Sequence, residues 1–485
     1  MDRLRISWDA FVVRSTHRSA LYFAVTAAAL GFFILCAMIV AGKLRLVPPV
    51  RDAKDYVAYA LAISDFGIFG KAHLGHTTIS PAADNLYGPL LPAAAATLFE
   101  VSPGFKQTVM CYIANPELPS NCQPVGWPYL LFNVVLASIT LGASVWIAVR
   151  LARALEYGAA AVSIIAGLTG FLVLLSPTIS LYVPSILTEM LLLTFSTLFF
   201  AFVLKAIQER NARSACLAAS GICVGLLSLT KPSYLYPAYF ALAALIGIWI
   251  YGYYRGSQTL KIRHIAAYLA GVGIVLSPWI ARNALVLDSY ALSSVYGGLI
   301  LVQRTAYNHL EWSEIAAAFI YWLPDFGDNL GKLLFSTTTI EHLGFGPNSM
   351  YHWSDELGRD LIAAAGGRAT LDRYVILHEL LSAPLKYIAT TAALAWRAIF
   401  IDKYLGYFSV ISAAALIIHR AGKPGYASLL ILTLPVALMV VFHAAISISI
   451  PRYNEPFLAV YAVMAAIGAY NSGFFVLKKA RGASA

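Results

Sequence analysis

Charged residues are scarce in this chain. Only 12% of its 485 residues are Asp, Glu, Lys or Arg, whereas 59% are hydrophobic. The mean hydropathy is +0.71. In soluble globular proteins about 25% of residues are charged. A protein that folds in water cannot bury so much apolar side chain, so the composition excludes a soluble globular domain.

The sequence also lacks the motifs of several enzyme classes. It contains no P-loop, no Rossmann glycine pattern and no Gly-x-Ser-x-Gly elbow, so ATP-driven and serine-hydrolase mechanisms lose most of their support. Ten histidines are present, but even His73 and His76, three residues apart, form no zinc-type spacing with cysteines or acids. We therefore expect no metal and no cofactor.

Cysteine is rare, with five residues in the whole chain. Cys36, Cys216 and Cys223 lie within apolar stretches, where we expect them to pack as small apolar side chains. Cys111 and Cys122 lie in a polar segment, where an oxidising compartment permits a disulfide. The sequence leaves open whether these two cysteines are bonded.

Long apolar stretches are what the chain has in abundance. A bilayer core of about 30 Å requires about 20 apolar residues in a spanning helix. We expect about ten such helices, at residues 20–43, 127–149, 158–176, 185–204, 214–229, 235–254, 265–281, 403–418, 427–449 and 456–477. The first stretch is too long for a cleavable signal peptide, so we expect a retained helix. The predicted fold class is an all-α, polytopic membrane protein.

Basic residues gather in alternate loops. They are Arg150, Arg153, Lys205, Arg210, Arg213, Arg255, Lys261, Arg263, Arg420, Lys423, Lys478, Lys479 and Arg481. Because basic residues resist translocation, we expect these loops and both termini in the cytoplasm, with the protein in the plasma (inner) membrane. The same distribution accounts for most of the net charge of +10, and no basic stripe with interleaved aromatics indicates nucleic-acid binding.

Two long outer segments interrupt what we expect to be a single membrane-embedded domain, 1–485. The first segment, 44–126, contains a predicted helix with its acids and tyrosines on one face, followed by an apolar stretch too short to span. The second, 282–402, is expected to form a small helical cap that ends in an amphipathic stretch at 385–400. No internal repeat supports an inverted-repeat transporter architecture.

Six charged residues lie at or just beyond the predicted outer ends of helices. They are Asp52, Asp55, Glu189, Lys231, Arg282 and Arg452. Ionisable groups near a membrane are costly, so those that topology does not explain are the best candidates for function. Together they form a layer at which an amphiphilic substrate can present a charged head group.

Each of these residues also has a purely structural interpretation. Asp52 or Asp55 can act as a general base, but Asp52 can equally be a helix N-cap and Asp55 a first-turn acid. Lys231 can bind a phosphate or simply extend from the interface to water. Glu189 can pair with Lys231 or Arg282, or bind a sugar hydroxyl. The residues alone leave these alternatives open.

Several short motifs carry a family resemblance. They are Arg51-Asp52-Ala-Lys-Asp55-Tyr56, Tyr87-Gly88-Pro89-Leu90-Leu91-Pro92, Leu187-Thr188-Glu189, Thr230-Lys231-Pro232, Pro278-Trp279-Ile280-Ala281-Arg282-Asn283 with Ser293-Ser294-Val295-Tyr296-Gly297-Gly298, and Pro451-Arg452-Tyr453-Asn454-Glu455-Pro456. In this order they resemble the GT-C superfamily of polyprenyl-phosphate-sugar-dependent glycosyltransferases. The branch concerned is similar to protein O-mannosyltransferases and the lipid A aminoarabinose transferase (glycosyltransferase family 39-like).

The resemblance implies an inverting sugar transfer on the outer face of the membrane. Asp52 would be the general base, and the donor phosphate would lie near Lys231, Arg282 or Arg452. The tyrosines that would contact substrate are Tyr56, Tyr59, Tyr87 and Tyr453. The departing polyprenyl phosphate is a stable anion, so no strong general acid is required. A metal is not obligatory either, because two or three side-chain cations could neutralise a monophosphate. The long segment after Arg282 matches nothing in the family, and the acceptor stays open among lipid, glycan and protein.

Two other classes compete with this interpretation. In a transporter or lipid flippase, Asp52 or Glu189 would couple proton movement to substrate passage, although such groups usually lie near the bilayer midplane. In an O-antigen polymerase or ligase, the decisive residues would be arginines of the second outer segment. These are Arg304, Arg359, Arg368 and Arg373.

Overall fold

The computed structural model describes residues 2–74, 79–115, 117, 119–122, 125–255, 260–293 and 296–482. Within these residues all regular secondary structure is helical and no strand occurs, which confirms the predicted all-α class. His76, Ser294 and Val295, which the sequence analysis names, lie outside the described residues.

The chain divides into two compact units. Unit 1 comprises Met1–Leu292, Ser412–Leu432 and Ala459–Ala485, and unit 2 comprises Ser293–Ile411 and Thr433–Leu458.

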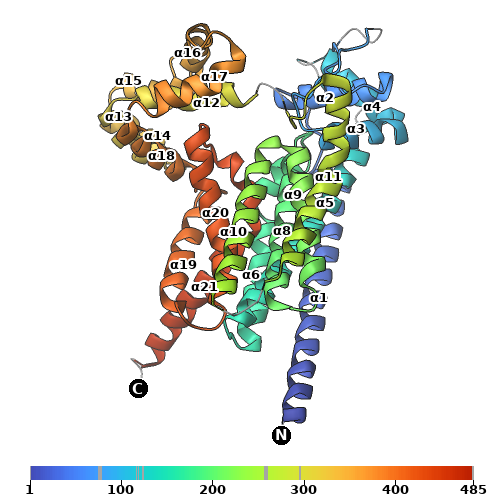
Figure 1. Cartoon of the computed structure of the whole chain (residues 1–485), viewed down its shortest axis with the longest axis vertical. Coiled ribbons are helices and arrows are strands. Elements are labelled where there is room, and N and C mark those ends of the chain that lie inside the picture. Colours follow the sequence, from blue (N-terminus) through green and yellow to red (C-terminus); the bar gives the residue numbers. More distant parts are fainter. Residues whose placement is uncertain are drawn as a thin grey trace. The chain divides into compact units, whose positions relative to one another are not determined.

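Unit 1 contains the long apolar helices. Its elements are α1 (Asp2–Val40), α2 (Asp52–Phe66), α3 (Leu90–Val101), α4 (Pro103–Ala114), η1 (Pro119–Asn121), α5 (Trp127–Ala154), α6 (Ala159–Leu174), α7 (Pro177–Tyr182), α8 (Glu189–Gln208), α9 (Arg213–Thr230), η2 (Pro232–Tyr234), α10 (Leu235–Tyr254) and α11 (Ile262–Leu287), with parts of α19 (Leu405–Arg420) and α20 (Tyr426–Ile446) and most of α21 (Leu458–Gly482). Figure 1 shows its long helices side by side, with α2, α3 and α4 together at one end.

Eight described helices are long and apolar enough to cross a membrane. They are Ser19–Val40, Trp127–Ala154, Ala159–Tyr182, Glu189–Gln208, Arg213–Thr230, Pro232–Tyr254, Ile262–Leu287 and Tyr426–Ile446. Each coincides with a predicted span, and together they identify an integral membrane protein. The other two predicted spans are also helical, as α19, with 16 residues, and α21, with 25.

Helices α9 and α11 approach each other closely through glycine. A Cβ atom at Gly221 would clash with the carbonyl oxygen of Tyr268, and one at Gly271 would clash with that of Ala218. Small residues permit such backbone contact where there is no hydrophobic force to drive helices together in lipid. Lys231 directly follows α9, and Arg282 lies within the last two turns of α11.

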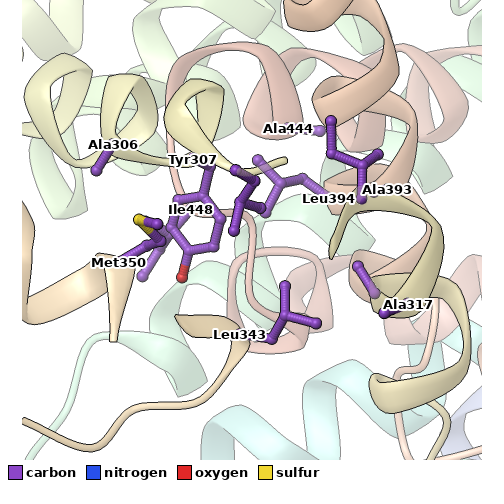
Figure 2. Close-up of a cluster of buried hydrophobic side chains, with 12 residues drawn as sticks. Ala306, Tyr307, Ala317, Leu343, Met350, Ala393, Leu394, Ala444 and Ile448 are labelled. Atoms are coloured by element: carbon purple, nitrogen blue, oxygen red, sulfur yellow. The ribbon is translucent and has the colours of Figure 1, made fainter. Parts of the chain in front are cut away.

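Unit 2 is built from shorter helices. They are α12 (Tyr296–Ala306), η3 (Tyr307–His309), α13 (Trp312–Tyr321), α14 (Gly327–Leu334), α15 (Thr337–Leu343), α16 (Met350–Ala364), η4 (Arg368–Thr370), α17 (Leu371–Tyr374), η5 (Val375–Leu380), α18 (Pro384–Ala398), η6 (Pro451–Tyr453) and η7 (Glu455–Phe457). The predicted helical stretch at 385–400 corresponds to α18. Figure 2 shows the cluster around Tyr307, Leu343, Leu394 and Ile448 that packs several of these helices together.

Arg304 is fully buried inside unit 2. Its Nε donates to the carbonyl oxygen of Ala444 at 2.8 Å, and its terminal nitrogens donate to Asn308, Thr390 and Thr391 at 2.8 to 2.9 Å. Burial lowers the pKa of the guanidinium to about 10, which still leaves it charged at neutral pH. Arg304 therefore joins α12 to α18 and α20, and it is not the accessible loop cation that a polymerase or ligase would require.

Cys111 and Cys122 form a disulfide, with Cα atoms 5.8 Å apart. The bond answers the question that the sequence leaves open. It joins the end of α4 to the segment before α5, at the same end of unit 1 as α2.

Candidate active site

The cluster of candidate residues begins at the start of α2. Asp52 is the first helical residue and is half-buried, and Arg51 holds the N-cap position with no side-chain hydrogen bond to the helix. Arg51 has φ 49° and ψ −124°, a conformation that side-chain-bearing residues rarely adopt. Asp52 is thus not the cap, and a strained residue directly precedes the predicted base. Such strain is concentrated at functional sites.

Asp55 lies one turn further along α2 and is held by two partners. The Tyr87 hydroxyl donates to its Oδ2 at 2.7 Å, and the Lys71 ammonium lies 2.6 Å from its Oδ1. The Asp55 side chain is 25% exposed, so it is accessible at the edge of the cluster. Both oxygens of this carboxylate are therefore occupied, one by a phenol and the other by a cation.

Aromatic rings fill the space beside these acids. The Tyr87 ring lies 5.3 Å from that of Tyr56 and 5.5 Å from that of Tyr59, both edge to face. Phe69 continues the stack, 4.7 Å from Tyr59 and 4.8 Å from Trp279. Tyr56 and Tyr59 are buried, whereas Tyr87 is half-buried. Tyr87 is therefore the ring of these three that a substrate can reach most easily.

Asp84 organises the loop that carries Tyr87. Its Oδ1 accepts from the Tyr59 hydroxyl at 2.6 Å and from the backbone N–H of Leu86 at 3.0 Å. The first bond ties the loop to α2, and the second shapes the turn before Tyr87. Sequence reasoning missed Asp84, although the adjacent acid and amide of Asp84-Asn85, just before Tyr87-Gly88-Pro89, were a signal of a structured turn.

Arg282 reaches across to the same loop from α11. Its Nη1 donates to the carbonyl oxygen of Asp84 at 2.7 Å and its Nη2 to that of Phe69 at 2.9 Å. The guanidinium also lies over the Trp279 ring, 4.9 Å from its centre. These bonds join the loop to α11, so the geometry favours a positioning role for Arg282 over direct contact with a phosphate.

Gly88 allows the loop that carries Tyr87 to approach the backbone directly before Lys231. A Cβ atom at Gly88 would clash with the carbonyl oxygens of Leu229 and Thr230, at the end of α9. Only a residue without a side chain allows this approach. The backbone directly before Lys231 therefore packs against the residue that follows Tyr87, and Lys231 itself is half-buried.

Glu189 lies in the first turn of α8 and is 3% exposed. Its carboxylate is within electrostatic range of the hydroxyls of Tyr129 and Tyr234. Tyr234 is the last residue of the short η2 helix, which directly follows Lys231. Glu189 therefore interacts electrostatically with the segment next to Lys231. A role for Glu189 in binding sugar stays a prediction.

Arg452 and Tyr453 belong to η6 of unit 2, and the Tyr453 ring lies 5.9 Å from that of His443. Asp52, Asp55, Tyr56, Tyr59, Tyr87, Glu189, Lys231 and Arg282 all belong to unit 1. The predicted participation of Arg452 and Tyr453 in the site stays a prediction. Among the described residues, no group of three His, Cys, Asp or Glu side chains is arranged to hold a metal ion.

Fold and site define an all-helical integral membrane protein with acids, phenols and cations gathered at one end of unit 1. No family model matches the chain, and no curated protein does.

The solved structures that match the chain include two of ArnT from Cupriavidus metallidurans. The one bound to undecaprenyl phosphate is 14% identical, with a TM-score of 0.36 over 93% of this chain and 77% of that chain. The apo structure is also 14% identical, with a TM-score of 0.37 over 94% and 77%. A third is the archaeal oligosaccharyltransferase AglB from Archaeoglobus fulgidus with an inhibitory peptide and a dolichol-phosphate, 13% identical, with a TM-score of 0.44 over 95% of this chain. The chain covers 51% of the AglB chain.

Proposed function

We propose that this chain is a membrane glycosyltransferase that moves a sugar from a polyprenyl-phosphate donor to an acceptor hydroxyl. One observation carries the proposal. The loop that bears Tyr87 joins α2, the helix of Asp52 and Asp55, to the segment before Lys231, through the bond from Tyr87 to Asp55 and the close approach of Gly88 to Thr230. A base, an aromatic surface and a phosphate-binding cation are the groups that such a transfer needs.

Asp52 is the proposed general base. Its carboxylate takes the proton of the acceptor hydroxyl while that oxygen attacks the anomeric carbon of the donor. The bond from the anomeric carbon to the phosphate oxygen breaks, and polyprenyl phosphate leaves with the bonding electrons. Attack opposite to the leaving group inverts the anomeric configuration. Asp55, held by Tyr87 and Lys71, keeps the aromatic surface in place beside the reacting sugar.

Lys231 is the proposed partner of the phosphate. A fixed cation stabilises the negative charge that develops on a departing phosphate, because it needs no reorganisation during the reaction. Arg452 is a second candidate for the same task. Tyr87 is the ring proposed to face the sugar, and the acceptor is a hydroxyl of a lipid, a glycan or a protein.

The proposed site faces the outer side of an inner membrane, with both termini in the cytoplasm. The alternation of basic loops supports this orientation. In Figure 1 the start of α1 and the end of α21, both in unit 1, lie at the end opposite to α2, α3 and α4. A site at the start of α2 would then lie on the side away from both termini.

The test compares two Asp→Asn variants in the same helix. Purified full-length protein is mixed with defined polyprenyl-phosphate sugars and extracted envelope acceptors, and products are measured by mass spectrometry. Asp52→Asn is expected to lower transfer at least 100-fold, since a positioned general base contributes about 10²–10⁴-fold. Asp65→Asn is the control, because Asp65 lies at the other end of α2 in an ion pair with Lys106. Full transfer by the Asp52 variant would overturn the assignment.

A further inference from the structure

Unit 2 contains an open pocket of about 600 Å³, and none of its lining residues is among those proposed for sugar transfer. This volume lies within the roughly 300–1,000 Å³ typical of small-molecule sites. Its polar lining residues are His309, His342, Asn348, His352, Trp353 and Glu356. Three of them, His352, Trp353 and Glu356, come from the first two turns of α16, and the others come from η3, α15 and the loop before α16.

His342 is fixed in orientation by a buried acid. Its Nδ1 lies 2.7 Å from Oε1 of Glu314, and the other oxygen of Glu314 accepts from the backbone N–H of Glu311 at 2.7 Å. Glu314 is 6% exposed. Because Nδ1 faces this carboxylate, Nε2 is the ring nitrogen left for a ligand.

Trp353 provides an aromatic surface beside these polar groups. It is half-buried, and the His309 ring meets it edge to face with centres 5.0 Å apart. His309 is in turn 3.6 Å from Oε2 of Glu379. Met350 also lines the pocket and belongs to the apolar cluster of unit 2. This part of the pocket therefore packs directly on the core of the unit. The wall is thus built on packed elements, although His309, Asn348 and His352 are exposed at its rim.

The chemistry of the lining excludes several ligand classes. Metal binding is disfavoured, because the described part of the chain holds no group of three His, Cys, Asp or Glu side chains placed to bind an ion. An anion would meet the carboxylate of Glu356. A lipid tail would find too few apolar side chains. What remains is a ligand with many hydroxyl groups and one weakly polar face.

We propose that this pocket binds a carbohydrate. The C–H face of a sugar ring packs on Trp353, since an indole ring offers a large apolar face. The ring hydroxyls, which both donate and accept, pair with the mixed donors and acceptors of the pocket, which are His342, Asn348, His352 and Glu356. Binding here does not require the transfer chemistry of unit 1, so this inference goes beyond the proposed function and can fail or succeed separately from it.

The experiment measures sugar binding by the full-length protein in lipid nanodiscs, because maltoside and glucoside detergents carry sugar head groups. Saturation-transfer-difference NMR is run with glucose, galactose, mannose, N-acetylglucosamine and their disaccharides. At least one of these sugars is expected to bind saturably. Trp353→Ala and His352→Ala are each expected to weaken that binding at least tenfold.

Three controls make the result specific. Trp312→Ala removes a tryptophan of the same unit that is 58% exposed and outside the pocket, so it should leave binding unchanged. Asp52→Asn should abolish transfer and keep binding, which separates the two proposals. The pocket assignment is overturned if no sugar of the panel binds, if both pocket variants bind like the wild type, or if Zn²⁺ or inorganic phosphate binds in a way that depends on His352 and sugars do not.

Discussion

At the scale of single residues, Arg51 has the most unusual backbone in the candidate site. Its φ of 49° with ψ of −124° brings Cβ close to its own backbone, a conformation that glycine adopts without this clash. Such a residue costs about 1–3 kcal/mol, and the surrounding structure must hold it there. The backbone is therefore strained at Arg51, directly before Asp52.

This strain predicts a difference between two substitutions. Arg51→Gly should raise the free energy of unfolding by about 1 kcal/mol relative to Arg51→Ala, because glycine tolerates the positive φ. Both variants remove the same side chain, so each controls for the other. Thermal unfolding in nanodiscs measures the difference, and an alanine variant as stable as the glycine variant would contradict it.

The second prediction at this scale concerns substitutions of Asp84. Asp84→Ala should destabilise the protein by about 2 kcal/mol, because it removes two hydrogen bonds, one from the Tyr59 hydroxyl and one from the Leu86 N–H. Asp84→Asn keeps an oxygen at the same position and should retain most of the stability. Sugar transfer should fall in the same order, and equal unfolding temperatures for the two variants would argue against the positioning role.

The sequence predicts Asp55, Tyr59 and Tyr87 as site residues but misses Lys71 and Asp84, for a physical reason. The helix follows from local spacing, which places Asp55 and Tyr59 on one face. Lys71 and Asp84 join these side chains from 16 and 25 residues away, through a loop whose path depends on Arg282 in α11. No local pattern encodes such a path, so long-range contacts decide which loop residues belong to the site.

At the scale of elements, the loop around Gly88 controls how the tyrosine network meets α9. Gly88→Ala would place a Cβ against the carbonyl oxygens of Leu229 and Thr230 and should push the loop away. We expect transfer to fall at least tenfold, because displacement of a positioned group by about 1 Å can cost 10²-fold. Gly167→Ala in α6, where a Cβ meets nothing within 4 Å, is the matched control.

The measurement for Gly88→Ala is sugar transfer together with unfolding temperature. A variant that keeps full transfer would show that the close approach to α9 has no part in the reaction. Loss of transfer in the Gly167 control would show instead that transfer responds to any added methyl group.

The membrane-spanning helices are easier to predict from the sequence than the segments that connect them. Eight predicted spans coincide with apolar helices, because the bilayer demands long apolar runs that any window of the sequence reveals. The sequence predicts the second outer segment only as a small helical cap that ends in an amphipathic stretch, since its short helices, α12 to α18, are ordered by packing around residues such as Tyr307 and Leu394. Arg304 illustrates the limit: in the sequence it resembles a loop cation, yet it is fully buried.

At the scale of the whole molecule, the two units differ in the interactions that stabilise each of them internally. Unit 1 relies on long helices with close glycine contacts, whereas unit 2 relies on a small apolar cluster and the bonds of Arg304. A buried cation without its acceptors, or acceptors without their cation, costs about 1–3 kcal/mol for each orphaned group. Arg304 is therefore the residue on which the stability of unit 2 depends most clearly.

Arg304→Ala should destabilise unit 2 by about 3 kcal/mol or more, because several buried acceptors lose their donor at once. Hydrogen-exchange mass spectrometry should show faster exchange in α12 and α18 and unchanged exchange in α9 and α11. Arg359→Ala, at an exposed position of α16, should change stability by less than about 0.5 kcal/mol. Uniformly faster exchange in both units would contradict the division of the chain.

We propose that the membrane helices support chemistry on a lipid-linked sugar. The most direct measurement follows both products of purified wild-type protein in nanodiscs, by mass spectrometry for polyprenyl phosphate and by NMR for the anomeric configuration. Sugar transfer predicts one polyprenyl phosphate released for each sugar transferred, with inverted configuration at the anomeric carbon. A donor that crosses the bilayer of sealed vesicles intact, with no polyprenyl phosphate released from any donor tested, would contradict the account and favour a flippase.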